Sequence, residues 1–382
     1  MKNSLLLLLL IISFSLAGCK QTSAPQAQTK TTDSPSDQLP HPAGGTTLAP
    51  PEVKYFRGSI GSALGLQMKL IRDGEKLSGN YLYHKVGTNI DLKGTIDKDG
   101  NLTLEEFEAG GKQTGIFKGV WKGDNEDGLI SIAGNWTRPN GDKKTAFSLH
   151  QEPIEFTGPV EIVAKQIKEA NKKLNYKIDA EYPQLTGSTD PNYAKFNQHA
   201  KGLVTKEVSD FRKSMVEDSG EDIPSESGSD IGIGYIVAFA NDDLVSIQFD
   251  TGSYYRGAAH PNSHSQVVNF DLKNGKPIRL ADLFKPGSKY LQTIAAYCIK
   301  DLKKQSKAKG ADGMLDDDWI QRGAAAEATN YESWAITRRG LGINFDSYQV
   351  GPYAAGPQYV LIPYEALKEI IRPEGPVAQF VK

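Results

Sequence analysis

The feature that most restricts the fold is a glycine that recurs within short strand-like runs between residues 53 and 151. Each run has an apolar residue two positions before the glycine and another two positions after it; the runs read LSGNY, LKGTI, FKGVW and IAGNW, around Gly79, Gly94, Gly119 and Gly134. A glycine inside a strand permits sharp curvature or close approach of a neighbouring backbone. Asp-Gly and Asn-Gly pairs, which favour hairpin turns, separate the strands. The pattern predicts an antiparallel all-β barrel or sandwich of about eight strands at 53–152, able to hold a ligand or filled by its own side chains.

One acidic turn in this region partly resembles a calcium-binding loop. Asp97, Asp99, Asn101 and Glu108 have the ligand spacing of an EF-hand, but the sixth position of the loop is Leu102, where that motif needs glycine. The flanking segments are also strand-like rather than helical. We therefore predict a plain hairpin turn.

Residues 153–382 mix strand-like and helical patterns. Alternating apolar residues after Tyr176 predict a strand that we expect Pro183 to end. Asp190 and Pro191 are typical of a helix start. We further expect strands within 235–254, with a turn at 241–243, and within 265–275; helices at 288–305 and 318–331; a hairpin turning at 339–340; and a last strand at 358–363. Because these elements lack regular βαβ alternation, the sequence predicts an α+β domain.

Length and charge limit the possible classes of protein. The 382 residues suffice for two domains, and we expect two independently folding units, 53–152 and 153–382, joined near 152–158. The formal net charge of −2 argues against a dedicated nucleic-acid binder. The sequence shows no phosphate-binding loop, no nucleophile motif of the G-x-S-x-G kind and no convincing metal-ligand set, so we predict no cofactor and no metal.

The N-terminus predicts where the protein is placed. Lys2 and an apolar run from Leu5 to Phe14 resemble a signal peptide. The sequence LAGC that follows is typical of a bacterial lipobox, so we predict that residues 1–18 are removed and that Cys19 is lipidated, which would anchor the protein to a membrane. Residues 19–52 are rich in Gln, Thr, Ser, Pro and Ala, and we expect a disordered tether. The protein would then be a lipoprotein of the bacterial cell envelope, facing the periplasm or the exterior; the alternative is an ordinary secretory signal with a chance cysteine.

The second of the two cysteines, Cys298, is expected to be structural. It shares one helical face with Leu291, Ile294 and Leu302. A cysteine on a buried apolar face is usually inert. Because the other cysteine is Cys19, the sequence offers no disulfide framework within the chain.

The sequence GSYYRGAAHPNSH concentrates the candidate site residues, which are Tyr254, Tyr255, Arg256, His260 and His264. Histidines four apart face one metal ion on a helix, but Pro261 and the strand-like residues that follow argue against a helix. His260 could instead act as an acid or base, assisted by Arg256 or a carboxylate. We favour a structural loop in which Gly257 bends the chain and His260 bonds to backbone groups, while Tyr254, Tyr255, Arg256 and His260 present a binding surface.

Segments between Ala180 and Ile370 resemble a known pair of extracellular domains of unknown function. The segments that carry the resemblance read AEYPQLTG, LVSIQF, GAAHPNSHSQVVNFDLKNGKPIRLADLF and INFDSYQVGPYAAGPQYVLIPYEAL. The pair is found in the outer part of the sigma-V anti-sigma factor, a lysozyme sensor, and in the non-catalytic N-terminal half of a peptidoglycan deacetylase. The resemblance implies an α+β fold and envelope placement, and it suggests recognition of lysozyme or peptidoglycan. The region predicted to be a barrel lies outside it.

Two departures from these families shape the functional hypothesis. The sequence has no transmembrane helix and no cytoplasmic sigma-binding segment, so we do not expect an anti-sigma factor. It ends soon after the module, where the deacetylase continues into its catalytic domain, so we do not expect that activity. We therefore predict a lipid-anchored, non-catalytic binding module of the cell envelope. The alternative is an envelope hydrolase that acts on cell-wall glycan or peptide through Arg256 and His260.

Overall fold

The computed structural model describes residues 51–62, 64–83, 88–123, 129–217, 228–308 and 314–381. The predicted signal peptide, Cys19 and the predicted tether as far as residue 50 lie outside the described residues. Among the helices that are described, none combines the length and the apolar character needed to cross a membrane.

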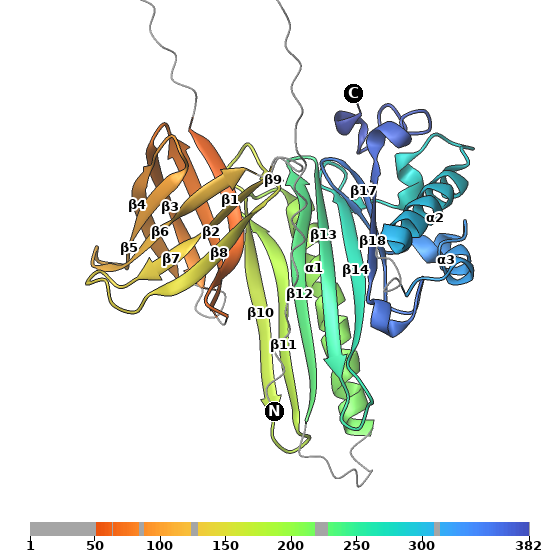
Figure 1. Ribbon diagram of the computed structural model, residues 1–382, viewed down its shortest axis with the longest axis horizontal. Coiled ribbons are helices and arrows are strands. Elements are labelled where there is room, and N and C mark those ends of the chain that lie inside the picture. Colours follow the sequence, from red (N-terminus) through yellow and green to blue (C-terminus); the bar gives the residue numbers. More distant parts are fainter. Residues whose placement is uncertain are drawn as a thin grey trace, which may run out of the picture. The chain divides into compact units, whose positions relative to one another are not determined.

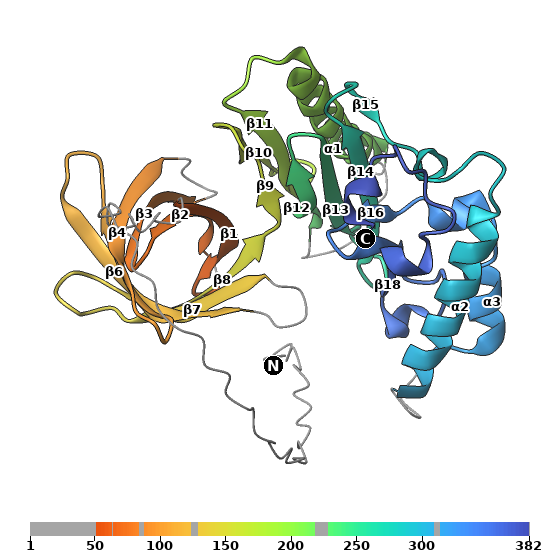
Figure 2. The same cartoon turned by 90° about the horizontal axis from the view of Figure 1, so that it is seen from above.

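The first part of the chain is a closed antiparallel barrel (Figure 1). Each strand pairs with the next along the chain, and β1 also pairs with β8, which closes the ring seen nearly end-on in Figure 2. This confirms the predicted antiparallel β fold, and of the two alternatives it is the barrel that forms. The strands are β1 (Glu52–Ile60), β2 (Leu64–Asp73), β3 (Lys76–Tyr83), β4 (Asn89–Ile96), β5 (Asn101–Phe107), β6 (Gln113–Gly123), β7 (Ile130–Thr137) and β8 (Thr145–Glu152).

The recurring glycines allow the barrel strands to approach closely. A side chain at Gly94 would place its Cβ 1.9 Å from the carbonyl oxygen of Thr103 on the neighbouring strand. Gly119 and Gly134 lie directly opposite each other on β6 and β7. Buried side chains from all sides of the ring fill its interior, among them Phe56, Leu66, Met68, Leu70, Tyr81, Leu104, Phe117 and Ile132. A barrel of this size is therefore a packed core.

The acidic turn between β4 and β5 is the expected hairpin. The Asp97 carboxylate accepts hydrogen bonds from the backbone N–H groups of Asp99 (2.9 Å) and Asn101 (2.8 Å). The side-chain amide of Asn101 also donates to this carboxylate, at 2.9 Å. The Asp97 carboxylate thus shapes the turn through its own hydrogen bonds.

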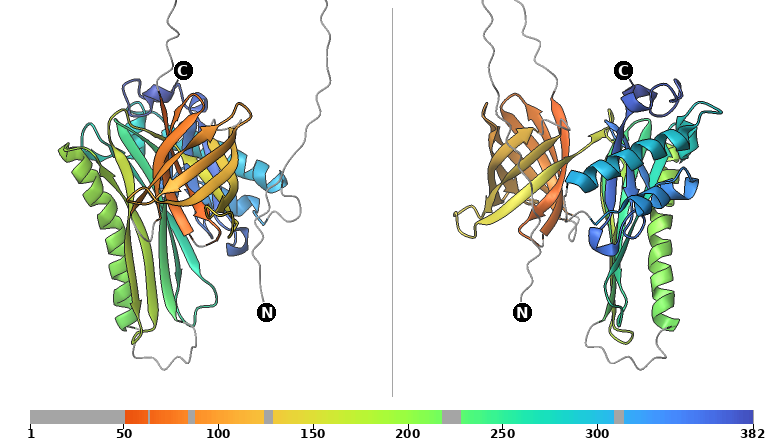
Figure 3. Two further views of the ribbon diagram at one scale, coloured as in Figure 1. Left: turned by 90° about the vertical axis from the view of Figure 1, so that its left-hand side faces the viewer. Right: turned by 45° about the vertical axis from the view of Figure 1, so that its right-hand side comes forward.

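A long mixed sheet follows the barrel. Its path is β10-β11-β12-β13-β14-β15, and β9 pairs with the far end of β12. Helix α1 (Pro191–Glu217) connects β11 to β12, which run parallel, and Figure 3 shows it lying along the strands. The predicted apolar positions of α1 form its buried face against this sheet. The strands are β9 (Ile154–Glu155), β10 (Glu161–Asn171), β11 (Tyr176–Thr186), β12 (Ser229–Asn241), β13 (Leu244–Tyr254), β14 (Asn262–Asp271) and β15 (Lys276–Pro277).

The prediction that Pro183 ends its strand is wrong. β11 continues to Thr186, and Pro183 lies opposite Ala164 of β10. The parallel ladder with β12 stops at Ala180. Beyond that residue, β11 needs no backbone donor on its β12 side, so a proline is tolerated there.

A second apolar core lies in the C-terminal part of the chain. It is built by α2 (Tyr290–Ala308), α3 (Asp317–Gly323) and a three-stranded sheet of β16 (Trp334–Ile336), β17 (Gly340–Phe345) and β18 (Gln358–Pro363). The single helix expected at 318–331 is wrong, because α3 stops at Gly323 and a 3-10 turn forms only at Ala328–Tyr331. The backbone of Gln349 packs against Gly323, leaving no room for a Cβ. Strands and helices together confirm the predicted α+β class.

Candidate functional site

The candidate site residues lie at the turn between β13 and β14. Ser253 pairs with Asn262, and residues 255–261 connect β13, which ends at Tyr254, to β14. Gly257 has a φ of 85°, a left-handed conformation that glycine adopts without strain. The backbone N–H of Ala258 donates to the carbonyl of Tyr255 at 2.9 Å. The loop therefore has a defined conformation, and the side chains of its two halves contact different parts of the chain.

The first half of the loop is attached to the long sheet and α1. The ring of Tyr255 lies 5.6 Å from that of Phe211 on α1, and 36% of Tyr255 remains exposed. The backbone N–H of Arg256 donates to the hydroxyl of Ser229 at 3.0 Å. Tyr254 is half-buried at the end of β13. These contacts position the first three candidate residues.

The second half of the loop stacks on a different segment of the chain. The imidazole of His260 lies on the ring of Tyr353, with centroids 4.1 Å apart and an angle of 26° between the planes. Its Nδ1 is 2.8 Å from the carbonyl oxygen of Pro261, which also accepts a hydrogen bond from the Tyr353 hydroxyl at 2.8 Å. The expected bond from His260 to a backbone group is thus present.

This geometry determines the tautomer of a neutral His260. A carbonyl oxygen can only accept, so Nδ1 carries the proton. Nε2 is then the acceptor, and it lies 3.3 Å from the hydroxyl of Tyr348, which donates to it. Both ring nitrogens are therefore engaged. Tyr348, Tyr353 and His260 form a cluster of three adjoining rings that we call the aromatic platform.

Tyr348 holds an unusual backbone conformation. Its φ is 73°, in the left-handed region, although it is not glycine, and half of its surface (50%) is exposed. Such strain persists where surrounding contacts determine the backbone, and it is found disproportionately at functional sites. Trp319 of α3 donates its indole N–H to the carbonyl of Tyr348 at 2.9 Å. Asp346 accepts from both the backbone N–H (2.9 Å) and the hydroxyl (2.8 Å) of Ser265.

The two histidines of the motif have different partners. His264 lies on β14 opposite Thr251, and its Nε2 is 3.8 Å from a carboxylate oxygen of Glu207 on α1. His260 instead belongs to the aromatic platform. Within the part of the chain that the structure describes, no three His, Cys, Asp or Glu side chains are grouped as metal ligands would be. The spacing of the histidines therefore does not translate into convergence on one ion.

Cys298 lies on the buried face of α2 beside Ile294 and Leu302. Burial, with a smaller contribution from Asp301, raises the pKa of its thiol to about 12. A thiol with that pKa is almost wholly protonated near neutral pH, which makes it a poor nucleophile.

Sequence reasoning identified His260 but missed Tyr348 and Tyr353. These tyrosines lie in the connection between β17 and β18, about ninety residues further along the chain. Their segment carries a sequence signal, because Gly351, Pro352 and Gly356 mark an irregular loop, and loops often carry binding residues. Nothing in the sequence indicates that this loop meets the β13–β14 turn.

Two family models match adjoining parts of the chain. The model described as Deacetylase PdaC matches residues 168–263, and the model described as Protein of unknown function (DUF3298) matches residues 281–365. These matches support the predicted resemblance to a pair of domains. The first matched region contains His260 and the second contains Tyr348 and Tyr353, so the aromatic platform joins the two.

Curated relatives are 25% identical to the chain over the residues that align. Peptidoglycan-N-acetylmuramic acid deacetylase PdaC of Bacillus subtilis is 25% identical over 244 residues, which cover 64% of this chain and 48% of the deacetylase. Immunogenic proteins MPB64 of Mycobacterium bovis and MPT64 of Mycobacterium tuberculosis are 25% identical over 115 residues, covering 30% of this chain and 47% of theirs. The chain thus spans about half the length of the curated relatives it matches.

A solved structure resembles part of the chain. The crystal structure of a DUF3298 family member from Bacteroides fragilis aligns with a TM-score of 0.44 and 21% sequence identity, covering 59% of this chain and 98% of that one.

Proposed function

We propose that the protein is a binding module of the bacterial cell envelope that recognises the glycan of peptidoglycan through the aromatic platform. The observation that carries this proposal is the platform itself: Tyr348 is half-exposed, held in a strained conformation and flanked by the stacked rings of Tyr353 and His260. Tyrosine rings offer a flat apolar face and a polar edge, which suits the alternating C–H and hydroxyl groups of a sugar. Tyrosine is also frequent among the residues that dominate binding energy.

The comparisons support the choice of ligand. A relative with 25% identity carries the name Peptidoglycan-N-acetylmuramic acid deacetylase PdaC. The part of this chain that matches the two family models supplies all three rings of the platform. A module that binds peptidoglycan has to lie near the cell wall. The proposed lipid anchor at Cys19 and the proposed tether at 19–52 would hold it there.

We further propose that the platform binds without catalysis. The hydrolase alternative requires His260 to present a free ring nitrogen, with Arg256 close by. Instead, both ring nitrogens of His260 have partners. A general base must reach the proton that it abstracts, and Tyr348 occupies that position on His260.

Equilibrium binding tests the proposal. The full chain in lipid nanodiscs is titrated with peptidoglycan glycan strands from which the stem peptides have been removed. In a parallel assay the protein is incubated with intact peptidoglycan, and the release of soluble muropeptides is monitored. We expect saturable binding to the glycan strands and no release of fragments. Release that disappears in His260→Ala with unchanged thermal stability would favour the hydrolase.

Lysozyme serves as the competing ligand, because the resemblance to the sigma-V sensor points to it. The same preparation is titrated with lysozyme. If the protein binds lysozyme but not the glycan strands, peptidoglycan is refuted as the ligand. The protein would then be a muramidase sensor.

A further inference from the structure

A polar groove of about 360 Å³ lies close to the aromatic platform. Its lining comes from α1, from β14, from the turn at 329–333 and from the residues on either side of Tyr348. Asp346 and Gln349, which both line the groove, are within two residues of Tyr348 in the chain. Two residues of chain span at most about 7 Å. The groove therefore begins beside the most exposed ring of the platform.

The side chains at this end of the groove are held by hydrogen bonds and still offer acceptor oxygens. Asp346 uses Oδ1 for both of its bonds from Ser265, so Oδ2 can accept from a ligand. Gln349 donates its amide N–H groups to the carbonyls of Gly323 (3.1 Å) and Asn330 (3.0 Å), so its amide oxygen remains an acceptor. A ligand rich in hydroxyl donors would complement these fixed oxygens.

The other end of the groove carries exposed polar side chains. Thr329 lies in the 3-10 turn Ala328–Tyr331, and Glu332 follows that turn directly. Both residues are exposed, and neither side chain is bonded to another residue that the structure describes. A ligand could form hydrogen bonds with them without breaking bonds within the protein.

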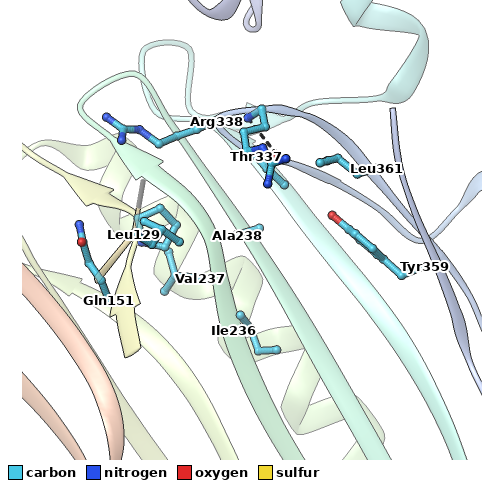
Figure 4. A pocket seen from close by; sticks show the side chains of 11 residues that line it. Leu129, Gln151, Ile236, Val237, Ala238, Thr337, Arg338, Tyr359 and Leu361 are labelled. Atoms are coloured by element: carbon cyan, nitrogen blue, oxygen red, sulfur yellow. Dashed lines mark hydrogen bonds between the residues drawn. The ribbon is translucent and has the colours of Figure 1, made fainter. Parts of the chain in front are cut away.

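A second hollow, drawn in Figure 4, differs in chemistry. Its lining includes Ile236, Val237 and Leu361, which offer contact area but no side-chain hydrogen bonds. A sugar carries hydroxyl groups around its ring, and a hydroxyl moved from water to an apolar surface without a partner costs free energy. Of these two hollows, the polar groove is therefore the one that suits a glycan.

The charge of the groove distinguishes between the two sugars of peptidoglycan. Glu332 and Asp346 place carboxylates in its lining. N-acetylmuramic acid bears a lactyl group whose carboxyl is either ionised or joined to a stem peptide, whereas N-acetylglucosamine has no such group. Like charges a few ångströms apart repel, and sites use such repulsion to reject a competing ligand. The groove therefore favours N-acetylglucosamine.

We propose that the groove is a second sugar subsite, which binds an N-acetylglucosamine unit while the adjoining N-acetylmuramic acid unit stacks on the aromatic platform. The inference rests on the proposed function, because it extends the same glycan site. It depends, however, on Thr329, Glu332, Asp346 and Gln349 rather than on the rings of the platform. Because linked contacts reinforce each other, affinity should depend on the number and on the order of the sugars.

The first experiment varies the number of sugars. The full chain in lipid nanodiscs is titrated with N-acetylglucosamine and with chitobiose, its disaccharide. We expect chitobiose to bind at least roughly tenfold more tightly. The double variant Thr329→Val, Glu332→Ala should lose most of that gain. The matched control is Thr95→Val, Glu105→Ala, which changes exposed residues of the barrel strands β4 and β5 and should leave both affinities unchanged.

The second experiment varies the order of the sugars. The ligands are the two disaccharides that join N-acetylglucosamine and N-acetylmuramic acid in opposite order. Only one order places N-acetylglucosamine in the groove when N-acetylmuramic acid lies on the platform. We expect that disaccharide to bind about as well as chitobiose and the other at least roughly fivefold more weakly. Glu332→Gln, which removes a charge but keeps the shape of the side chain, should narrow the difference.

The outcomes separate this inference from the proposed function. Equal affinity for N-acetylglucosamine and chitobiose, or for chitobiose in the wild type and the groove variant, overturns the groove even if Tyr348→Ala shows that the platform binds sugar. Equal affinity for the two mixed disaccharides also overturns it. Binding of peptide-free glycan strands without binding of chitobiose at millimolar concentration overturns the groove alone. Chitobiose binding that falls in the groove variant but survives Tyr348→Ala supports the groove and refutes the platform.

Discussion

Replacing Tyr348 by glycine and, separately, by alanine measures the strain that we ascribe to its backbone. Both variants lose the ring, so their difference reports mainly the backbone. A residue with a Cβ pays about 1–2 kcal/mol in the left-handed region, and the φ of Tyr348 is 73°. Glycine avoids that cost, but it lowers the free energy of unfolding by roughly 0.4–1 kcal/mol because it gives the unfolded chain more conformational freedom. We therefore expect Tyr348→Gly to be more stable than Tyr348→Ala by about 1 kcal/mol.

Urea denaturation of the full chain measures this difference. Because the two variants expose similar surface on unfolding, the shift of the midpoint at constant slope gives the change in free energy of unfolding. The matched control is the same pair of substitutions at Tyr359, which lies in the extended strand β18. At Tyr359 the sign should reverse, because glycine weakens a strand relative to alanine. Equal stability of the Tyr348 variants, or a more stable alanine variant, would refute the strain argument.

Three further predictions concern other parts of the chain. In the barrel, the buried Glu106 carboxylate accepts hydrogen bonds from Tyr81 (2.5 Å) and Trp136 (3.0 Å), so Glu106→Ala should cost about 3 kcal/mol in a denaturation experiment and Glu106→Gln clearly less; equal losses would contradict this account. Metabolic labelling with a palmitate analogue should mark the wild type and not Cys19→Ala, and equal labelling of both would exclude lipidation at that residue. Limited proteolysis should cut within 152–158 and leave two stable fragments, whereas a resistant single unit would contradict independent folding.

The barrel could be predicted because its sequence carries local signals. Gly94 and the equivalent glycines mark points where the backbone of the neighbouring strand comes so close that a Cβ atom would not fit. Turn residues separate the strands. Both features act over a few residues, so a local pattern is enough. Helix α1 was predictable for the same reason, because its buried residues recur at helical spacing from Tyr193 to Met215.

Strand β10 shows where local patterns stop being informative. Its sequence, EIVAKQIKEAN, is rich in Glu, Lys, Gln and Ala, which favour helices rather than strands. Nevertheless, it pairs with β11 along its whole length. The tertiary environment therefore overrides propensity in this segment, and no strand was predicted there.

The candidate site was predictable only in part. His260 stood out because histidine, glycine and proline cluster in one short stretch. Its partners, Tyr348 and Tyr353, come from a loop distant in sequence, and that contact depends on how the β13–β14 turn meets the C-terminal core. The positive φ of Tyr348 is also invisible in the sequence, because tyrosine, unlike glycine, does not indicate a left-handed conformation.

The affinity of Tyr348→Ala for peptide-free glycan strands tests the central claim most directly. Loss of an aromatic anchor residue costs more than about 1 kcal/mol, so we expect the dissociation constant to rise roughly fivefold or more. Tyr359→Ala, which removes a similarly exposed tyrosine outside the aromatic platform, should leave the dissociation constant unchanged. Equal glycan affinity of the wild type and Tyr348→Ala, or equal losses in Tyr348→Ala and Tyr359→Ala, would contradict the platform as the glycan site.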